Sequence, residues 1–396
     1  MKNILLIVNK LPIPYYRDGV TLINYRILQY APLDYSFDIL SITKEENDTI
    51  QTIKKSFNSI NNVFDIISSE PSSFLRLVSL ISFALVGRSF CITSLDKKLK
   101  TLNLDKYCLI YISTPPAPLY FSNIISKYPL FINAIDSFSL LNNRFHFYQK
   151  DIISYMKELI YKIAERKCFK KAVLVNFVSE LDKEFTSNFC KTNNLISVTN
   201  GVDAEYFSPN FQNRDDCSML FVGNFNYQPN NVAVIQFIKN IYPKVKNAYP
   251  NVILYIVGMN GNFNFDDKSI IVTGFTDDLR CYYKKATIFI SPLKSGSGVK
   301  NKILEAMASG IPIISTTIGV DGINGVENNK NALISDTDEA FTNNIFQLFK
   351  DENKRFDLAN SARKLIESDF SWQNKISLYY LWFKKIIEKN TMFLTI

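Results

Sequence analysis

The sequence predicts an α/β protein built from two doubly wound, Rossmann-like parallel-sheet domains. Short apolar runs alternate with longer stretches of helical periodicity along the chain, and this alternation is typical of strand–helix–strand units with parallel sheets. The length of 396 residues is too great for one ordinary domain and indicates two or three. Both halves share the same strand–helix order, so we expect two sheets that face each other across an interdomain cleft.

Apolar runs predict the strands of each half. In the N-terminal half we expect strands at Ile4–Val8, Phe37–Ser41, Leu109–Ser113, Phe131–Ala134, Val173–Val178 and Leu195–Val198, with helices at Val20–Tyr30 and Asp151–Phe169. In the C-terminal half we expect strands at Ser218–Val222, Val252–Val257, Ile270–Thr273, Ile288–Ser291 and Pro312–Ser315. The helices expected there are Asn231–Asn247, Thr276–Lys285, Lys300–Ala308 and Asp338–Leu348.

A run of turn-forming residues, TNGVDAEYFSPN at Thr199–Asn210, separates the two halves. We therefore expect an N-terminal domain over residues 1–200 and a C-terminal domain over 201–372. The remaining segment, 373–396, contains a predicted helix at Gln373–Ile387 with an apolar stripe. Such a stripe packs against a neighbouring core, and we expect this helix to pack back toward the N-terminal domain.

Composition limits the class of partner. Apolar residues make up 47% and charged residues 21% of the chain, as in a globular protein. The net charge of +8 suits phosphate-bearing small molecules or an anionic membrane surface. No helix-turn-helix, RNP or zinc signature accompanies the charge, so we expect no nucleic-acid binding. The basic clusters Lys97–Lys100 and Arg166–Lys171 fit either solvated helix faces or a membrane patch.

The six cysteines lie far apart without a CxxC pair, which is typical of reduced residues in a cytoplasmic protein. The apolar run Ile4–Val8 is short and has no cleavage site after it, so it predicts a buried strand and not a signal peptide. The stretch Phe74–Val86 is too short to span a bilayer and is interrupted by Arg76. We therefore expect no transmembrane segment.

The segment Ser295–Gly310 is the most informative part of the sequence. Gly296 and Gly298 follow a predicted strand and let the backbone come close to a ligand. The helix that begins near Val299–Asn301 directs its free N–H groups and positive dipole end at this loop. Lys300 and Lys302 add full positive charges. These features predict a diphosphate site.

Glu305 lies five residues after Lys300 on the same predicted helix. A carboxylate there repels phosphate and needs another partner, and a ribose diol offers two donors at a suitable spacing. A glycine loop before a helix also occurs as a purely structural turn, and the pattern by itself leaves that alternative open.

The stretch resembles the donor-binding signature of family 4 (group 1) retaining glycosyltransferases, in which a Gly-rich loop runs into K-x-x-E-A-M-A-x-G-x-P and then T-x-x-G. The matching residues are Lys302, Glu305, Ala306, Met307, Ala308, Gly310, Pro312, Thr316 and Gly319. Similar elements precede it: the hinge TNGVD (Thr199–Asp203), the first strand and helix of the C-terminal lobe, and the turn of VTGFTDDL. The likeness covers Val178–Ile323 and implies the GT-B fold, with an N-terminal acceptor-binding and a C-terminal donor-binding domain.

The resemblance assigns roles to individual residues. It implies that Glu305 binds the ribose hydroxyls and that Lys302 and the backbone near Gly298 bind the diphosphate. Gly19, after the first strand, would let the N-terminal domain approach the donor phosphate. The complete set expected to contact the donor is Gly19, Gly274, Phe275, Thr276, Ser297, Gly298, Val299, Lys300, Lys302 and Glu305. The turn Gly274–Thr276 would flank the base.

Two departures from the family pattern limit what can be carried over. Ser297 stands where the family has an acidic residue that contacts sugar hydroxyls, so the identity of the sugar is not implied. Asn224 and Asn230 stand where many members have an Arg and a Lys that clamp the diphosphate. We expect Lys300 and Lys302 to replace that clamp.

Asp136 follows the predicted strand Phe131–Ala134 and is the candidate catalytic residue, because family members place a His or an acid close to the reacting carbon there. A helix N-cap is the alternative role for Asp136. His146, the single histidine, lies among aromatic residues, and its part in catalysis stays open. The family acts without a metal-binding D-x-D motif, and none lies at a predicted strand end, so we expect no metal and no cofactor.

The function that these features predict is retaining transfer of a sugar from a nucleoside-diphosphate sugar to a glycan or lipid-linked acceptor in bacterial surface polysaccharide synthesis. The expected location is cytoplasmic or peripheral at the inner face of the cell membrane. Two alternatives remain: a catalytically silent GT-B scaffold of a glycan-assembly complex, and a nucleotide-sugar epimerase. The base, the sugar, the acceptor and the oligomeric state do not follow from the sequence.

Overall fold

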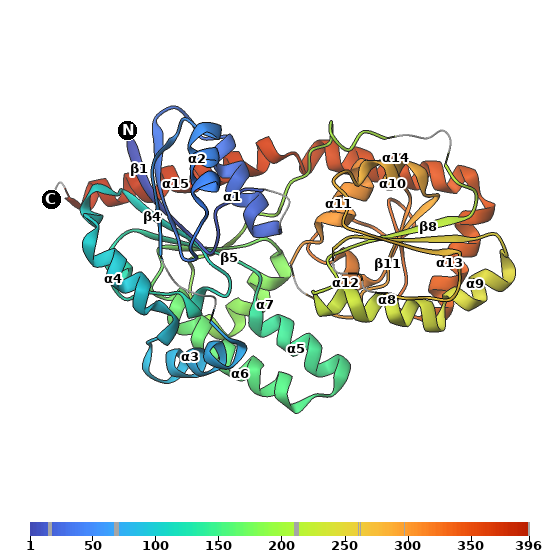
Figure 1. Cartoon of the computed structure of the whole chain (residues 1–396), viewed down its shortest axis with the longest axis horizontal. Helices are drawn as coiled ribbons and strands as arrows, with labels where there is room; N and C mark the ends of the chain where they lie inside the picture. Colours follow the sequence, from blue (N-terminus) through green and yellow to red (C-terminus); the bar gives the residue numbers. More distant parts are fainter. Residues whose placement is uncertain are drawn as a thin grey trace. The chain divides into compact units, whose positions relative to one another are not determined.

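A computed structural model describes residues 1–14, 18–66, 71–209, 214–259, 261, 263–296 and 298–394 of the chain. The chain divides into two units, of which unit 1 comprises Met1–Thr199 and Lys375–Ile396 and unit 2 comprises Asn200–Asn374. Each unit has its own parallel sheet (Figure 1).

Unit 1 contains a seven-stranded sheet in the order β3-β2-β1-β4-β5-β6-β7 (Figure 1). Its strands are β1 Lys2–Val8, β2 Tyr35–Ser41, β3 Ile60–Asp65, β4 Leu109–Ser113, β5 Leu130–Ile135, β6 Leu174–Phe177 and β7 Leu195–Ser197. The chain proceeds outward from β1 to β3 and then returns to β4 on the other side of β1. The strand order therefore reverses between β1 and β4, and ligands of open parallel sheets bind outside the carboxyl ends of strands at such a reversal.

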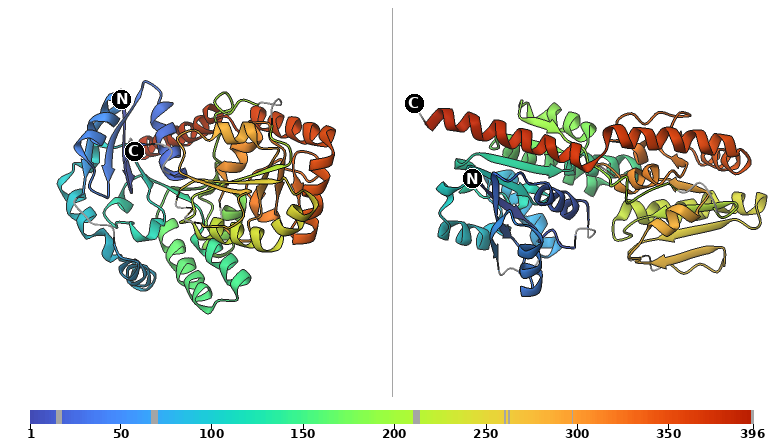
Figure 2. Two further views of the ribbon diagram at one scale, coloured as in Figure 1. Left: turned by 45° about the vertical axis from the view of Figure 1, so that its right-hand side comes forward. Right: turned by 90° about the horizontal axis from the view of Figure 1, so that it is seen from above.

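Helices connect the strands of unit 1: α1 Gly19–Gln29, α2 Asn47–Ser56, α3 Ser73–Val86, α4 Thr93–Thr101, α5 Phe138–Gln149, α6 Ile152–Phe169 and α7 Glu180–Cys190. The last helix of the chain, α15 (Trp372–Leu394), starts in unit 2 and then runs along unit 1 (Figure 2). Asn176 of β6 donates a hydrogen bond to the Tyr379 hydroxyl at 2.9 Å. The Tyr380 hydroxyl donates to the carbonyl of Ile27 at 2.6 Å, which ties α15 to α1.

Unit 2 contains a six-stranded parallel sheet in the order β10-β9-β8-β11-β12-β13. Its strands are β8 Ser218–Val222, β9 Ile253–Val257, β10 Ile270–Gly274, β11 Ile288–Ser291, β12 Ile313–Ser315 and β13 Leu333–Ile334. Its helices are α8 Gln228–Asn240, α9 Tyr242–Ala248, α10 Arg280–Lys285, α11 Asn301–Ala308, α12 Thr317–Val320, α13 Asp338–Lys350 and α14 Glu352–Asp369.

Helices cover both faces of the sheet of unit 2, and alternate strand residues point to opposite faces. Leu220 and Val222 of β8 pack in one cluster with residues of α11 and α14. Met219 and Phe221 pack in the other cluster with residues of α8, α9 and α13. This alternation explains why the strands of unit 2 appear as continuous apolar runs in the sequence.

The structure confirms every predicted strand and the doubly wound class of both sheets. The prediction of one helix over Asn231–Asn247 is wrong, because the chain breaks at Ile241 and restarts as α9 with Pro243 in its first turn, where a missing N–H is tolerated. Helix α10 starts at Arg280, later than the predicted Thr276, since Asp278 accepts the backbone N–H of Arg280 at 2.9 Å and holds a turn before it. Edge strands β3 and β13 were not predicted.

Candidate functional site

The strand order of unit 2 reverses at its centre, between the neighbouring strands β8 and β11. A crevice outside the carboxyl ends of these strands is the expected place for a ligand. The loops that enter it are Gly223–Tyr227 after β8 and Pro292–Lys300 after β11. They approach closely, because a Cβ atom added to Gly296 would lie 3.3 Å from the hydroxyl of Tyr227.

The loop after β11 turns into α11 through two glycines with positive φ, 127° at Gly296 and 67° at Gly298. Side chains rarely adopt this backbone, so the sequence needs glycine at both positions. Lys300 occupies the N-cap position without capping α11 through its side chain, and its ammonium donates to the Gly298 carbonyl at 2.8 Å. Partly buried Val299 packs against the core below. The first turn of α11 therefore lies at the crevice, in the geometry of an anion site.

The Lys302 ammonium is anchored between the two helices that border the crevice. It donates to Oδ1 of Asn230 on α8 at 2.8 Å and lies 4.2 Å from the centre of the Phe221 ring. Asn230 is itself held in place, because its Nδ2 donates to the Asn224 carbonyl at 2.9 Å. Burial lowers the pKa of Lys302 to about 7, and the nearby Lys300 acts in the same direction. An added anion would favour the charged form of Lys302.

Glu305 lies one turn after Lys302 on α11. Its Oε2 accepts a hydrogen bond from the buried Tyr283 hydroxyl at 2.9 Å, and Tyr283 also approaches the Lys302 carbonyl at 3.2 Å. Burial raises the pKa of Glu305, while the bond from Tyr283 and the charge of Lys302 oppose the rise. Tyr283 therefore fixes Oε2, and Oε1 is the carboxylate oxygen that would accept from a ligand.

The other predicted donor residues lie at different places. Gly274 ends the edge strand β10 with a φ of 69°, and Phe275 after it is 51% exposed. The Thr276 hydroxyl points back to the Asp278 carbonyl at 3.4 Å. Strand β10 lies two strands from β8, about 10 Å away at the usual spacing. Ser297 falls outside the described residues, so its role stays a prediction.

In unit 1, Gly19 and Asp136 both follow parallel strands. Gly19 is the first residue of α1, whose N-terminus is closed by a capping box between Asp18 and Thr21. Asp136 follows β5 directly after Ile135, which has a positive φ of 67°, and is partly exposed. The alternative role of Asp136 as helix N-cap is wrong, because Ser137 caps α5 by accepting the N–H of Leu140. The catalytic role of Asp136 remains a prediction.

His146 lies on α5, away from a strand end. Its Nδ1 is 3.0 Å from the Asp151 carbonyl oxygen, and its ring contacts Tyr155 with 5.2 Å between ring centres. These contacts hold the His146 ring between α5 and α6, and its part in catalysis stays open.

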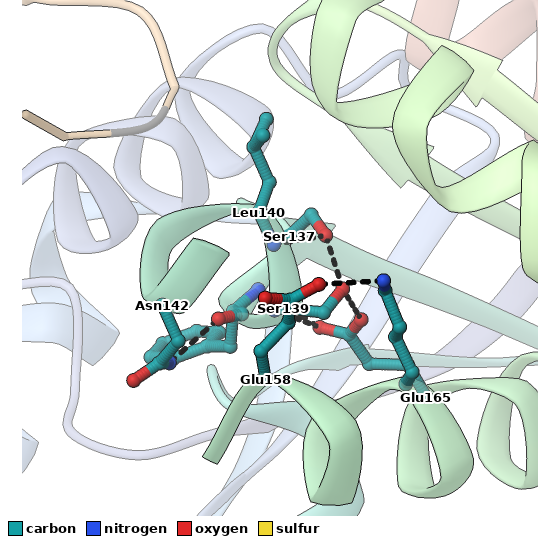
Figure 3. A network of polar contacts seen from close by, with 8 residues as sticks. Ser137, Ser139, Leu140, Asn142, Glu158 and Glu165 are labelled. Atoms are coloured by element: carbon teal, nitrogen blue, oxygen red, sulfur yellow. Dashed lines mark hydrogen bonds and ion pairs between the residues drawn. The ribbon is translucent and has the colours of Figure 1, made fainter. Parts of the chain in front are cut away.

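Two buried carboxylates that the sequence did not indicate, Glu165 and Asp182, hold the loop that follows Asp136. Figure 3 shows Glu165 beside Ser139. Glu165 of α6 accepts the N–H of Phe138 at 2.8 Å and the Ser139 hydroxyl at 2.6 Å. Asp182 of α7 accepts the N–H of Ser137 at 2.7 Å. They satisfy N–H groups at the start of α5 that the helix itself leaves unpaired. Nothing local in the sequence signals these contacts, since the partners lie far apart along the chain.

Glu165 gives unit 1 a specific dependence on pH. Burial raises its pKa from 4.5 to about 7, against the hydrogen bonds that it accepts from Ser139 and Phe138. Between pH 4.5 and 7 the folded protein binds more protons at this site than the unfolded chain, so the free energy of unfolding falls as pH rises. We expect Glu165→Gln to remove a difference on the order of 1–3 kcal/mol across this range. Urea unfolding at pH 5, 6 and 7.5 measures the free energy of unfolding of wild type and variant, with exposed Glu184→Gln as the control. The same pH dependence in wild type and Glu165→Gln would contradict the role of Glu165.

Several residues complete the site of unit 2 although no motif indicated them. Tyr283 orients Glu305, Tyr227 borders the glycine loop, and Asn200 of the linker donates to Asn301 Oδ1 at 2.6 Å at the start of α11. An aromatic residue or amide in a loop has many structural uses, so only the spatial contact identifies these roles. Within the described ranges, no three His, Cys, Asp or Glu side chains gather in a group that could hold a metal ion.

Comparison with protein families places this site in a known sequence pattern. Residues 216–351, which span β8 to α13, match the family model described as "Glycosyl transferases group 1". An uncharacterized 44.6 kDa protein in the cps region of Klebsiella pneumoniae is 27% identical over 168 residues. That alignment covers 39% of this chain and 43% of the relative, so it spans less than half of either protein.

Solved structures resemble the chain over almost its full length. HepE from Anabaena, crystallised with UDP and glucose, gives a TM-score of 0.68 at 14% identity and covers 96% of this chain and 99% of that one. Sucrose-phosphate synthase from Thermosynechococcus elongatus gives 0.69 at 14% identity, with 98% and 100% covered. A TarM mutant from S. aureus, in complex with fondaparinux, alpha-GlcNAc-glycerol and UDP, gives 0.64 at 13% identity, with 97% and 100% covered. With its two parallel sheets, the chain has the GT-B fold, and its residues 216–351 carry the pattern of the Glycosyl transferases group 1 family.

Proposed function

We propose that this protein is a retaining glycosyltransferase that moves a sugar from a nucleoside-diphosphate sugar to a glycan or lipid-linked acceptor. The observation that carries the proposal is the placement of Lys302 and Glu305 at the strand reversal of unit 2, within the segment that matches the family model. The relative in a cps region supports a role in surface polysaccharide synthesis.

Each part of the site has a counterpart on such a donor. The N-terminus of α11 and the Lys302 ammonium take the diphosphate. Oε1 of Glu305 accepts from the ribose hydroxyls, because Tyr283 already occupies Oε2. The exposed Phe275 ring, at the carboxyl end of β10, offers an apolar face to the base.

The proposed chemistry needs little from the protein beyond positioning and charge. The nucleoside diphosphate is a good leaving group, so the principal demand is to stabilise negative charge that develops on its β-phosphate. Lys302 and the N–H groups of α11 supply that stabilisation. Asp136 is proposed to lie beside the acceptor hydroxyl, in a loop that Glu165 and Asp182 hold in one conformation. The proposal requires no cofactor or metal.

The proposed location is cytoplasmic. All six cysteines are free thiols, which supports a reducing compartment. A peripheral position at the inner face of the cell membrane, next to a lipid-linked acceptor, belongs to the same proposal.

A thermal-shift screen tests the proposal. Purified protein is mixed in turn with nucleoside diphosphates and with their sugars. A ligand present at about 100 times its own dissociation constant adds about 2.7 kcal/mol to the free energy of unfolding. For a unit of this size we expect the unfolding midpoint to rise by about 5–10 °C with the correct donor. Slow release of nucleoside diphosphate from that donor should accompany the shift. No shift with any nucleotide would overturn the proposal, and binding without turnover on any acceptor would favour the silent scaffold.

A further inference from the structure

Helix α6 exposes a row of apolar side chains, whereas a surface helix of a globular protein usually places charged and polar residues on its outer side. Its buried side contains Ala164, Cys168 and Phe169, and also Glu158 and Glu165. Glu158 is paired with Lys162 of the same helix at 2.6 Å. Its exposed side carries apolar residues at positions i, i+4, i+7 and i+11, namely Ile152, Met156, Leu159 and Ile163. Ile152 is 67% exposed, so an apolar stripe faces outward along the helix.

Helix α3 presents a second stripe of the same kind. Phe74, Leu77, Ile81 and Leu85 follow each other at spacings of three and four residues, and all are exposed. Phe74 and Leu85 are 76% and 71% exposed. The opposite side of α3, with Leu80 and Phe83, is buried in the core of unit 1.

The two helices pack against each other beneath the sheet of unit 1 (Figure 1). The Lys167 ammonium of α6 donates to the Leu85 carbonyl of α3 at 2.8 Å, which joins their C-terminal ends. We refer to the eight outward apolar residues of these two helices as the α3/α6 surface. Single exposed apolar residues are common on proteins, but eight on two helices that contact each other indicate a partner.

Positive charge surrounds the α3/α6 surface. The segment 73–88 contains Arg76 and Arg88, both exposed, and no acidic residue. Helix α6 adds exposed Lys157 and Arg166, while its two glutamates are turned inward. Apolar residues within a basic border match the headgroup region of an anionic bilayer, where the apolar side chains enter the acyl boundary and the cations remain at the phosphates.

We infer that the α3/α6 surface docks unit 1 on the interface of an anionic lipid bilayer, with α3 and α6 lying in the plane of the membrane. Apart from Phe74 and Met156 the eight residues are aliphatic, and Tyr155, which is 41% exposed, borders the stripe of α6. An aromatic ring with a polar hydroxyl suits the headgroup level of a bilayer. No single helix in the described part of the chain is long and apolar enough to cross a membrane. Only together do Ser73–Val86 and Phe90–Thr101, which are bent by 105°, reach the necessary length and apolar content. The buried side of α3 favours docking over crossing. The inference identifies the surface for the peripheral location proposed above, and it does not depend on sugar transfer.

Vesicle flotation of the full chain tests the inference. We expect at least tenfold stronger binding to vesicles of phosphatidylcholine and phosphatidylglycerol in about a 7:3 ratio than to phosphatidylcholine alone, weakening at high salt. The double variant Leu85→Ser, Ile163→Ser should bind at least tenfold more weakly, because each substitution removes apolar side chain from the acyl boundary. Leu33→Ser, which removes a fully exposed leucine elsewhere in unit 1, is the matched control and should bind like wild type.

Three results would overturn the inference: no vesicle binding by the wild type, equal binding to both compositions, or wild-type binding by the double variant. A dimer in solution that the double variant dissociates would instead assign the surface to a second copy. As a second measurement, the tryptophan emission of a Phe74→Trp variant should move to shorter wavelength with anionic vesicles only. Nucleotide binding measured on the same variants keeps this test separate from the proposed function, since the α3/α6 surface lies in unit 1 and the donor site in unit 2.

Discussion

Glu305→Ala is expected to reduce nucleoside-diphosphate-sugar binding and transfer by about a hundredfold to a thousandfold. Hydrogen bonds to a charged group contribute about 1.5–3 kcal/mol each, and the carboxylate is proposed to accept two from the ribose. About 1.4 kcal/mol corresponds to a tenfold change, so the loss of both reaches this range. Isothermal titration with the donor found in the thermal-shift screen measures binding, and release of nucleoside diphosphate measures turnover.

The fold should persist in this variant. The Tyr283 hydroxyl loses Glu305 but retains the Lys302 carbonyl at 3.2 Å as an acceptor, so no buried donor is left without a partner. Exposed Glu339→Gln, which removes one carboxylate elsewhere in unit 2, controls for the change in net charge. If Glu305→Ala binds the donor as tightly as the wild type, Glu305 does not bind the ribose. That result would not contradict diphosphate binding at the N-terminus of α11.

Lys302→Ala is expected to weaken donor binding at least tenfold, with Lys294→Ala changing it less than twofold. Both lysines lie near the glycine loop, but only Lys302 is anchored at the crevice by Asn230 and Phe221. Lys294 is paired with Asp338 at 2.8 Å on the surface of unit 2. We expect the two variants to differ because Lys302, and not Lys294, forms a charge-assisted hydrogen bond to the donor phosphate. Equal effects of the two substitutions on the dissociation constant would contradict the role of Lys302.

The pKa of Lys302 predicts how donor affinity depends on pH. In the free protein burial holds the pKa of Lys302 at about 7, and a bound diphosphate raises it because the anion favours the charged form. Binding above pH 7 therefore takes up a proton, and affinity should fall as pH rises from about 7, by at most tenfold per pH unit. The phosphates of a nucleotide sugar stay ionised throughout, so they add no slope. Titrations between pH 6 and 9 should show this slope in the wild type and not in Lys302→Ala.

Much of the fold followed from local patterns in the sequence. Continuous apolar runs indicated the buried strands, and Gly296, Gly298 and the residues after them indicated a close turn at a helix N-terminus. These signals lie among neighbours along the chain, where spacing alone determines which face of a helix or strand is apolar. The break at Ile241, two residues before Pro243, was locally encoded as well and was missed because the helical periodicity continues across it.

The partners of the functional side chains were decided only by the tertiary structure. Asn230 and Lys302 are 72 residues apart, and they meet because β8 and β11 are neighbours in the sheet. The sequence identified Asn230 only as a departure from the family pattern, whereas the structure shows that it holds the lysine in place. The inward direction of Glu165 likewise depends on its distant contact with the start of α5.

The sequence by itself therefore determined the fold class, the strands other than β3 and β13, and the position of the glycine loop before α11, because each depends on the periodicity and backbone freedom of adjacent residues. Only the tertiary structure decided which carboxylate oxygen of Glu305 is bonded to Tyr283, what anchors Lys302, and which apolar residues of α6 are exposed. The physical reason is that burial and hydrogen bonding are set by which elements pack together, and strand order in a parallel sheet brings together residues that lie far apart along the chain.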